Sequence, residues 1–139
     1  MKRYALLPLA LLMAGCVSTR PIEPQIAAVS TDFSAVQRAE VSLSSFDFEP
    51  RNLQLAAGVP VELVFTNVSD SGHNFAAAEF FAAAQIRAED ADLVRNGLIE
   101  LRGGRGVSIF LVPVAGTYDV DCTHLGHSAL GMKGTIVVN

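Results

Sequence analysis

The sequence predicts an all-β protein, folded as a β-sandwich or barrel of about eight strands with a short helical insertion near residues 78–96. From residue 39 onward, short runs of alternating apolar and polar residues recur, and turn-forming residues separate them. One stretch rich in alanine and leucine breaks that period. Of the 139 residues, 50% are hydrophobic, so a single core of ordinary size can be built.

The first half of the domain is predicted to contain four strands. In the first of them Val41, Leu43, Phe46 and Phe48 stand in near-alternation, as expected for a strand with one buried face. A Ser-Asp-Ser-Gly turn separates the last two. The expected strands are residues 40–50, residues 52–55, residues 59–69 and a short strand that opens at His73.

The second half begins with the helical insertion. Residues 76–97 combine alanine, leucine and acidic residues and end in Asn96-Gly97, which predicts one or two short helices. The glycine-rich segment Arg102 to Gly106 is predicted to form the tip of a hairpin. The strands expected here are residues 98–101, 107–112, 117–121 and 135–138.

Residues 1–15 are predicted to be a lipoprotein-type signal peptide. Two basic residues precede an apolar stretch that is too short to span a bilayer. The ending Leu-Met-Ala-Gly-Cys is similar to a bacterial lipobox, in which the cysteine, here Cys16, carries lipid and becomes the new N-terminus. A plain signal peptide with an incidental cysteine is the alternative. Residues 16–38 are expected to be a lipid-attached tether, and residues 39–139 the folded domain.

Charge and cysteine content limit the functions that the protein can have. A net charge of −4 without basic runs argues against nucleic acid as a partner. Cleavage before Cys16 would remove Lys2 and Arg3, so 8 basic residues would face 14 acidic ones, a net charge of −6. If Cys16 carries lipid, Cys122 has no cysteine partner in the chain, and metal binding is one use for such a thiol. A disulfide between the two cysteines is the alternative.

Four soft side chains form a candidate metal site. Cys122, His127 and Met132 follow the spacing Cys-x4-His-x4-Met in a loop between two expected strands, and His73 opens an earlier strand. Two imidazoles, one thiolate and one thioether are the ligands of a blue-copper site, with the methionine as a weak axial ligand. Taken singly, His73 could be a turn residue and Met132 a core residue.

With these residues, the sequence resembles the cupredoxins, the family of plastocyanin, azurin and rusticyanin. The resemblance covers residues 40–139 and rests on His73-Asn74, on the loop from Cys122 to Gly134, and on the strand that follows this loop. It implies a Greek-key arrangement of the strands. It also implies one type 1 copper ion that cycles between Cu(II) and Cu(I).

The resemblance further implies the role of each site residue. It makes His73, Cys122 and His127 the equatorial ligands and Met132 the axial ligand. Asn74 and Thr123, which directly follow two ligands, are expected to hydrogen-bond to each other and tie the two ligand segments together.

His124 is a possible alternative ligand, because it lies between Cys122 and His127. The segment Cys122-x-His124 leaves little chain between two donors that must reach one ion, and the longer spacing to His127 matches the family. We therefore expect His124 to be an imidazole beside the site.

Other classes of function fit the sequence less well. A thiol enzyme could use Cys122 as nucleophile and a histidine as base, but no orienting third residue is evident and Met132 would be unexplained. A zinc hydrolase favours three firm ligands and an open position. A dinuclear copper centre of the terminal-oxidase kind needs two cysteines at the site. The remaining alternative is a periplasmic copper-binding protein that delivers the metal without shuttling electrons.

The sequence thus predicts a single-electron carrier, not an enzyme. We expect its location to be the periplasmic face of the bacterial cell envelope, with lipid on Cys16 as the membrane anchor. Val17 after that cysteine slightly favours the outer membrane. The expected partner is a redox protein such as a cytochrome, an oxidase or a reductase. Its docking face would be the apolar residues around His127, including Leu125 and Leu130, unless these leucines fold inward.

Overall fold

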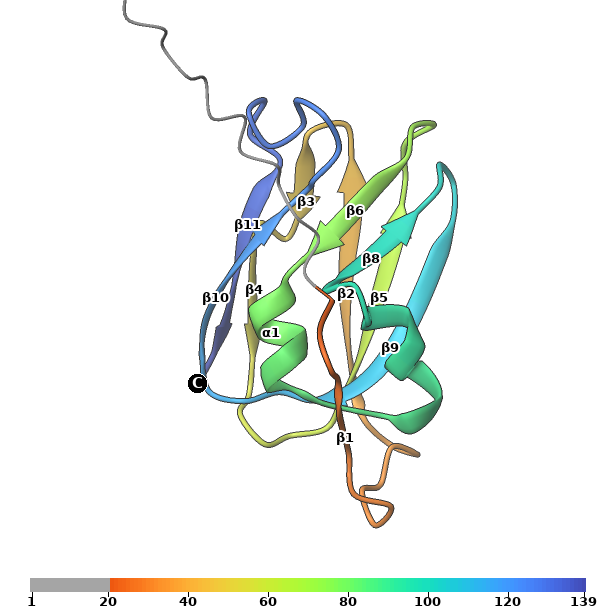
Figure 1. Ribbon diagram of the computed structural model, residues 1–139, viewed down its shortest axis with the longest axis vertical. Helices are drawn as coiled ribbons and strands as arrows, with labels where there is room; N and C mark the ends of the chain where they lie inside the picture. The colour runs from red at the N-terminus through yellow and green to blue at the C-terminus, as the bar shows by residue number, and fades with distance from the viewer. Residues whose placement is uncertain (1–20) are drawn as a thin grey trace, which may run out of the picture.

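Alternating burial along the strands builds a sandwich of two β-sheets, shown in Figure 1. In β5 (Val61–Asn67), for example, Val61, Leu63, Phe65 and Asn67 are buried and the residues between them face outward. The all-β prediction is confirmed. The structure is a computed structural model that describes residues 21–139, and the predicted signal peptide and Cys16 lie outside the described residues. None of the helices within 21–139 is long and apolar enough to cross a membrane.

The described part of the chain forms eleven strands, two short helical segments and two sheets. The first sheet has the order β1-β7-β9-β5-β2-β3 and the second the order β4-β11-β10-β6-β8. The strands other than β5 are β1 (Gln25–Ile26), β2 (Gln37–Ser44), β3 (Asp47–Glu49), β4 (Asn52–Leu55), β6 (His73–Ala76), β7 (Gln85–Ile86), β8 (Leu98–Leu101), β9 (Gly106–Val112), β10 (Gly116–Asp121) and β11 (Lys133–Val138).

Two parallel pairings hold distant parts of the chain together. In the first sheet β2 pairs with β5, and in the second sheet β11 pairs with β4. Among residues 21–139, hairpins join hydrogen-bonded neighbours only at β2–β3 and β10–β11. From β3 to β10 each connection crosses from one sheet to the other, so the loops gather at the two ends of the sandwich.

The hairpin predicted at Arg102 to Gly106 is wrong. The strand before it, β8, pairs with β6 in one sheet, whereas β9 after it pairs with β5 and β7 in the other. Instead, Gly103 allows the β8–β9 loop to lie close to the β5–β6 turn. A Cβ on Gly103 would lie 2.4 Å from the carbonyl oxygen of Asp70, so only glycine fits there.

The single strand expected over residues 40–50 is two strands, β2 and β3, joined by a tight turn. Phe46 lies in this turn with a φ of 71°, a left-handed conformation that is rare for an aromatic residue. The apolar alternation of the sequence shifts by one residue between Leu43 and Phe46, and this shift marks the turn.

The described part of the segment expected as a tether, residues 21–38, contributes to the first sheet. Strand β1 pairs in parallel with β7, and β2 begins at Gln37, inside the expected tether. Both β1 and β7 have only two residues, too few for any periodic pattern to appear in the sequence.

The helical insertion is confirmed as two short helices. The α-helix α1 (Ala78–Ala83) buries Phe80 and Phe81, and a 3₁₀-helix covers Ala88–Val94. Gly97, with a φ of 70°, follows the second helix as expected for a residue that ends it.

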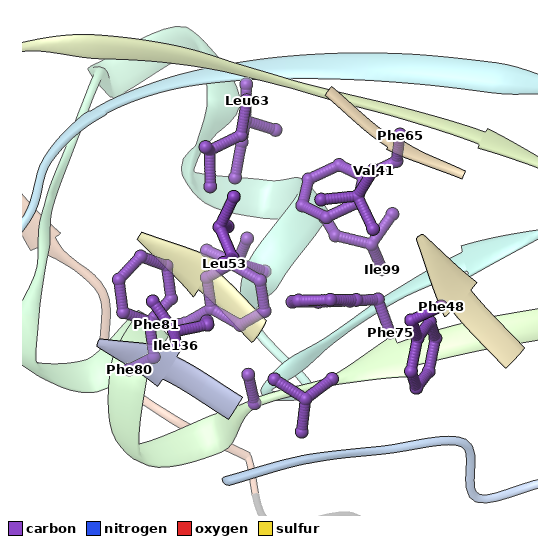
Figure 2. Packing of buried hydrophobic residues seen from close by; sticks show 14 of the residues in the cluster. Val41, Phe48, Leu53, Leu63, Phe65, Phe75, Phe80, Phe81, Ile99 and Ile136 are labelled. Carbon is purple, nitrogen blue, oxygen red and sulfur yellow. The ribbon is translucent and has the colours of Figure 1, made fainter. Parts of the chain in front are cut away.

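The core lies between the two sheets and contains five buried phenylalanines. Phe75 of β6 is at its centre, with ring centroids 5.4 Å from Phe48 and 4.9 Å from Phe65. Figure 2 shows these rings packed together with aliphatic side chains of other strands. Because His73 is two residues before Phe75 on the same strand, the packing that anchors this ring also fixes where the imidazole lies.

Candidate metal centre

The predicted ligands come together at one end of the sandwich. His73 is the first residue of β6, and Cys122, His127 and Met132 lie in the loop between β10 and β11. Figure 1 shows this loop at the same end as the β2–β3 turn and the β5–β6 turn.

Three side chains form the cluster itself. One ligand atom each of His73, Cys122 and His127 lies within 4.8 Å of the other two. The Nδ1 atoms of the two histidines are 3.1 Å apart, and Cys122 Sγ is 3.5 Å from Nδ1 of His127. Each of these side chains therefore turns a metal-binding atom toward one common point.

These distances fit a single bound ion. Two nitrogens that bind one ion at about 2.0 Å, with an angle of roughly 100–120° between them, are about 3.1–3.5 Å apart. The observed Nδ1–Nδ1 separation of 3.1 Å falls in that range. The donor set of one thiolate and two imidazoles suits copper, since the soft sulfur binds Cu(I) and imidazole suits both oxidation states. His73, Cys122 and His127 are thus positioned to hold one copper ion.

Met132 lies directly beside this cluster and is fully buried. Its backbone N–H donates to the carbonyl of His127 at 3.1 Å, and its carbonyl accepts from the N–H of Cys122 at 3.1 Å. Two backbone hydrogen bonds therefore tie the methionine to both ligands of the loop. This placement is consistent with the predicted axial role, which stays a prediction.

The β5–β6 turn that leads into His73 is held by the buried side chain of Asn67. Its amide donates to the carbonyls of Ser71 at 2.7 Å and Leu101 at 3.1 Å, and its oxygen accepts from the N–H of Ser69 at 3.0 Å. Because all polar atoms of this buried amide are bonded, the turn has one well-defined path. The imidazole of His73 is consequently presented to the loop in a fixed position.

Asn74 and Thr123 form the predicted contact. The amide of Asn74 donates to Thr123 Oγ1 at 2.8 Å, and the N–H of Thr123 donates to Asn74 Oδ1 at 2.9 Å. The two hydrogen bonds connect the residues that follow His73 and Cys122, so they tie the two ligand segments to each other.

Replacing Asn74 by alanine should weaken copper binding by about 10–100-fold, because outer hydrogen bonds hold metal ligands in place. The measurement is a competition titration of Cu(II) or Cu(I) against a chelator of known affinity. Asn96→Ala is the matched control, since Asn96 is exposed and lies just before Gly97, in a loop apart from the site. Equal copper affinity in the two variants would show that the Asn74–Thr123 contact does not support the site.

His124 does not belong to the cluster. Its ring centroid lies 6.4 Å from that of His73 and 5.4 Å from that of His127. Its Nε2 is 2.8 Å from Oε1 of Glu100, and the imidazole is partly exposed. The structure therefore agrees with the expectation that this imidazole stands beside the site.

The electrostatic environment favours the neutral form of the His73 imidazole. Burial lowers the pKa of His73, and the nearby imidazoles of His127 and His124 lower this pKa further, against a smaller opposite effect of Glu100. In addition, Nε2 of His73 is buried and has no hydrogen-bond partner among residues 21–139. Only the neutral imidazole can bind a metal, so the lowered pKa favours the metal-binding form.

The metal-free protein should lose stability as pH falls through 6.5, the ordinary pKa of histidine. The unfolded chain takes up a proton on His73 at a higher pH than the folded protein, so the free energy of unfolding decreases until the folded pKa is reached and then levels off. Denaturant titrations at several pH values measure this slope. A His73→Gln variant lacks the group and should show a smaller slope; an unchanged slope would contradict the assignment.

Phe46 is a neighbour of the site that sequence reasoning missed. Its ring stands edge-on to the imidazole of His127, with centroids 5.1 Å apart and an interplanar angle of 85°. In the sequence Phe46 has the pattern of a strand residue, and nothing local indicates that the turn directs it to a loop about eighty residues later.

The two-sheet sandwich and its His-Cys-His cluster, which is positioned to bind one copper ion, are typical of a copper-binding protein. In agreement, a profile of copper binding proteins of the plastocyanin/azurin family matches residues 35–139. The chain therefore belongs to the plastocyanin/azurin family. No curated protein sequence matches the chain significantly.

Solved structures of auracyanins are similar to this chain. Auracyanin B is 25% identical with a TM-score of 0.57, over 87% of this chain and 99% of its own. Auracyanin A, a "blue" copper protein from the green thermophilic photosynthetic bacterium Chloroflexus aurantiacus, is 26% identical with a TM-score of 0.50. The match covers 73% of this chain and 99% of that protein. Auracyanin from the photosynthetic bacterium Roseiflexus castenholzii is 19% identical with a TM-score of 0.56, and the match covers 76% of this chain and 99% of that protein. This similarity supports the fold alone.

Proposed function

We propose that this protein is a single-electron carrier whose copper ion cycles between Cu(II) and Cu(I), and that it is not an enzyme. We further propose that lipid on Cys16 anchors it at the periplasmic face of the cell envelope, with the outer membrane as the favoured side. The His73-Cys122-His127 cluster within the plastocyanin/azurin fold carries the proposal for the electron carrier. The lipobox-like sequence before Cys16 carries the proposal for the anchor.

The burial of the ligands favours electron transfer over copper delivery. Cys122, Met132 and His73 are each 0% exposed, and only His127 reaches the surface in part. A protein that hands its metal to an acceptor needs ligands that can be exchanged from outside. An electron carrier needs a site that stays the same in both oxidation states, and a buried, hydrogen-bonded ligand set meets this need.

The test separates these two functions. Voltammetry of the copper-loaded protein should give one reversible wave, and copper should stay bound when an apo copper acceptor is added in excess. Rapid transfer of copper to the acceptor, without a reversible wave, would favour the delivery function. Fractionation of cells that express the full chain, followed by mass spectrometry of the N-terminal peptide, tests the lipid anchor.

We propose that electrons pass through His127, because it is the ligand nearest the surface. Apolar side chains surround it: Leu125 is 100% exposed, Leu130 is 64% exposed and Phe46 is 38% exposed. The two leucines do not fold inward, so a small apolar patch is available to a redox partner. A patch of this size suits a contact that must be released quickly. The acidic surplus of the chain would favour a basic partner such as a cytochrome.

Leu130→Lys should slow electron transfer to a basic cytochrome while leaving the absorption spectrum and the reduction potential unchanged. The reason is that a lysine at the contact is repelled by the basic partner and must also be desolvated when the partner docks. Stopped-flow mixing measures the rate, which we expect to fall by about tenfold, the effect of ~1.4 kcal/mol. Val59→Lys is the control, since Val59 is 46% exposed and precedes β5 at the opposite end of the sandwich. Equal rates in both variants would place electron entry elsewhere.

A further inference from the structure

The imidazole of His124 lies close to the metal cluster without belonging to it. Cys122 and His124 follow directly after β10, and the ring centroid of His124 lies 5.4 Å from that of His127 and 6.4 Å from that of His73. His124 is thus a third imidazole near the ion that His73, Cys122 and His127 are positioned to hold. Its ring nonetheless lies outside that cluster.

The carboxylate of Glu100 holds His124 where it is. Oε1 of Glu100 is 2.8 Å from Nε2 of His124. On another side the ring lies against Gly72, where an added Cβ would be 3.3 Å from Cε1 of His124. The imidazole is therefore fixed between the carboxylate of Glu100 and the backbone of Gly72.

The same carboxylate also binds Asn74, the residue whose hydrogen bonds to Thr123 join the two ligand segments. Oε2 of Glu100 accepts from the amide of Asn74 at 3.2 Å, and this amide in turn donates to Thr123 at 2.8 Å. Glu100 thus links β8 to the segment of His73 through one oxygen and to the loop of Cys122 through the other.

We propose that Glu100 is a positioning residue that selects His127 over His124 as the copper ligand and aligns the two ligand segments. This proposal rests on the proposed copper site. Glu100 occupies the Nε2 atom of His124 and holds its ring away from the cluster, so the position facing Cys122 is left to His127. Among the described residues, Glu100 is the acidic side chain that bonds to both His124 and Asn74.

The first test uses the metal-free protein. Hydrogen–deuterium exchange at the N–H of Thr123, which donates to Asn74, should be several-fold faster in Glu100→Ala than in the parent. Glu100→Gln should stay close to the parent, because a glutamine amide can donate to His124 while its oxygen accepts from Asn74. Glu49→Ala, at an exposed strand position away from this network, is the control. Unchanged exchange in Glu100→Ala would overturn the alignment role.

The second test opens the ligand position of His127. In His127→Gly loaded with Cu(II), Glu100 should keep His124 away, so added free imidazole should change the visible absorption. In the double variant His127→Gly with Glu100→Ala, His124 is released and should bind, so the spectrum should no longer respond to imidazole. With Glu100→Gln in place of Glu100→Ala, the response should return.

The outcomes distinguish the two proposals. If His127→Gly ignores imidazole while Glu100 is intact, or if the double variant responds as fully as His127→Gly, then Glu100 does not select the ligand. If the parent protein shows no thiolate-to-copper absorption, the copper site itself is overturned. The exchange measurement on the metal-free protein then still decides whether Glu100 aligns the two segments.

Discussion

Cys122→Ser should abolish the intense visible absorption expected of the Cu(II)-loaded protein. This absorption arises from charge transfer between a thiolate and copper, and Cys122 supplies the sulfur, 3.5 Å from the ligand nitrogen of His127. A serine hydroxyl is a hard, protonated donor that does not replace a thiolate. We also expect copper affinity to fall by more than the roughly 10–100-fold that the loss of an outer hydrogen bond costs. Absorption spectra of equally loaded parent and variant proteins measure the first effect.

Met132→Leu is the control for this experiment. Met132 is the predicted axial ligand, and a thioether in that position binds weakly, so its loss should keep the colour and raise the reduction potential. Loss of colour in both variants would indicate general damage to the loop. An unchanged spectrum in Cys122→Ser would mean that the metal binds elsewhere.

Phe75→Ala should destabilise the fold by about 3–5 kcal/mol, the usual cost of truncating a buried phenylalanine. The ring is 2% exposed and contacts Phe48 and Phe65 from other strands, so its removal leaves a cavity that the sheets cannot close. Urea titration measures the free energy of unfolding. The variant should also bind copper less tightly, since His73 is on the same strand.

The control for Phe75→Ala is Leu125→Ala. Leu125 is 100% exposed, so its truncation should change the free energy of unfolding by less than about 0.5 kcal/mol. Similar losses in the two variants would contradict the placement of Phe75 at the centre of the core.

Local sequence patterns were sufficient to predict individual strands and the candidate metal ligands. The strand at residues 59–69 alternates clearly, and its central part is β5. The ligands were predictable because cysteine, histidine and methionine are rare enough in this chain for their clustering to stand out.

Features that depend on distant pairing could not be predicted in this way. The segment after β8 has the glycines of a hairpin, and only the pairing of β8 with β6 and of β9 with β5 shows that it joins two sheets. Glu100 alternates along a strand like any surface glutamate, so its bonds to His124 and Asn74 appear only when the β10–β11 loop is placed beside β8.

The parallel pairing of β11 with β4 also determines when the metal centre can form. Thr135, just after the ligand loop, hydrogen-bonds to Asn52, 83 residues earlier in the chain. Contacts of such long sequence separation form slowly, because a large loop must close before they are gained. We therefore expect the ligands to meet only after most of the sandwich has folded, unlike those of a small metal finger. A bound ion would then act mainly on the rate at which the folded protein opens, and little on the rate at which the chain finds its fold.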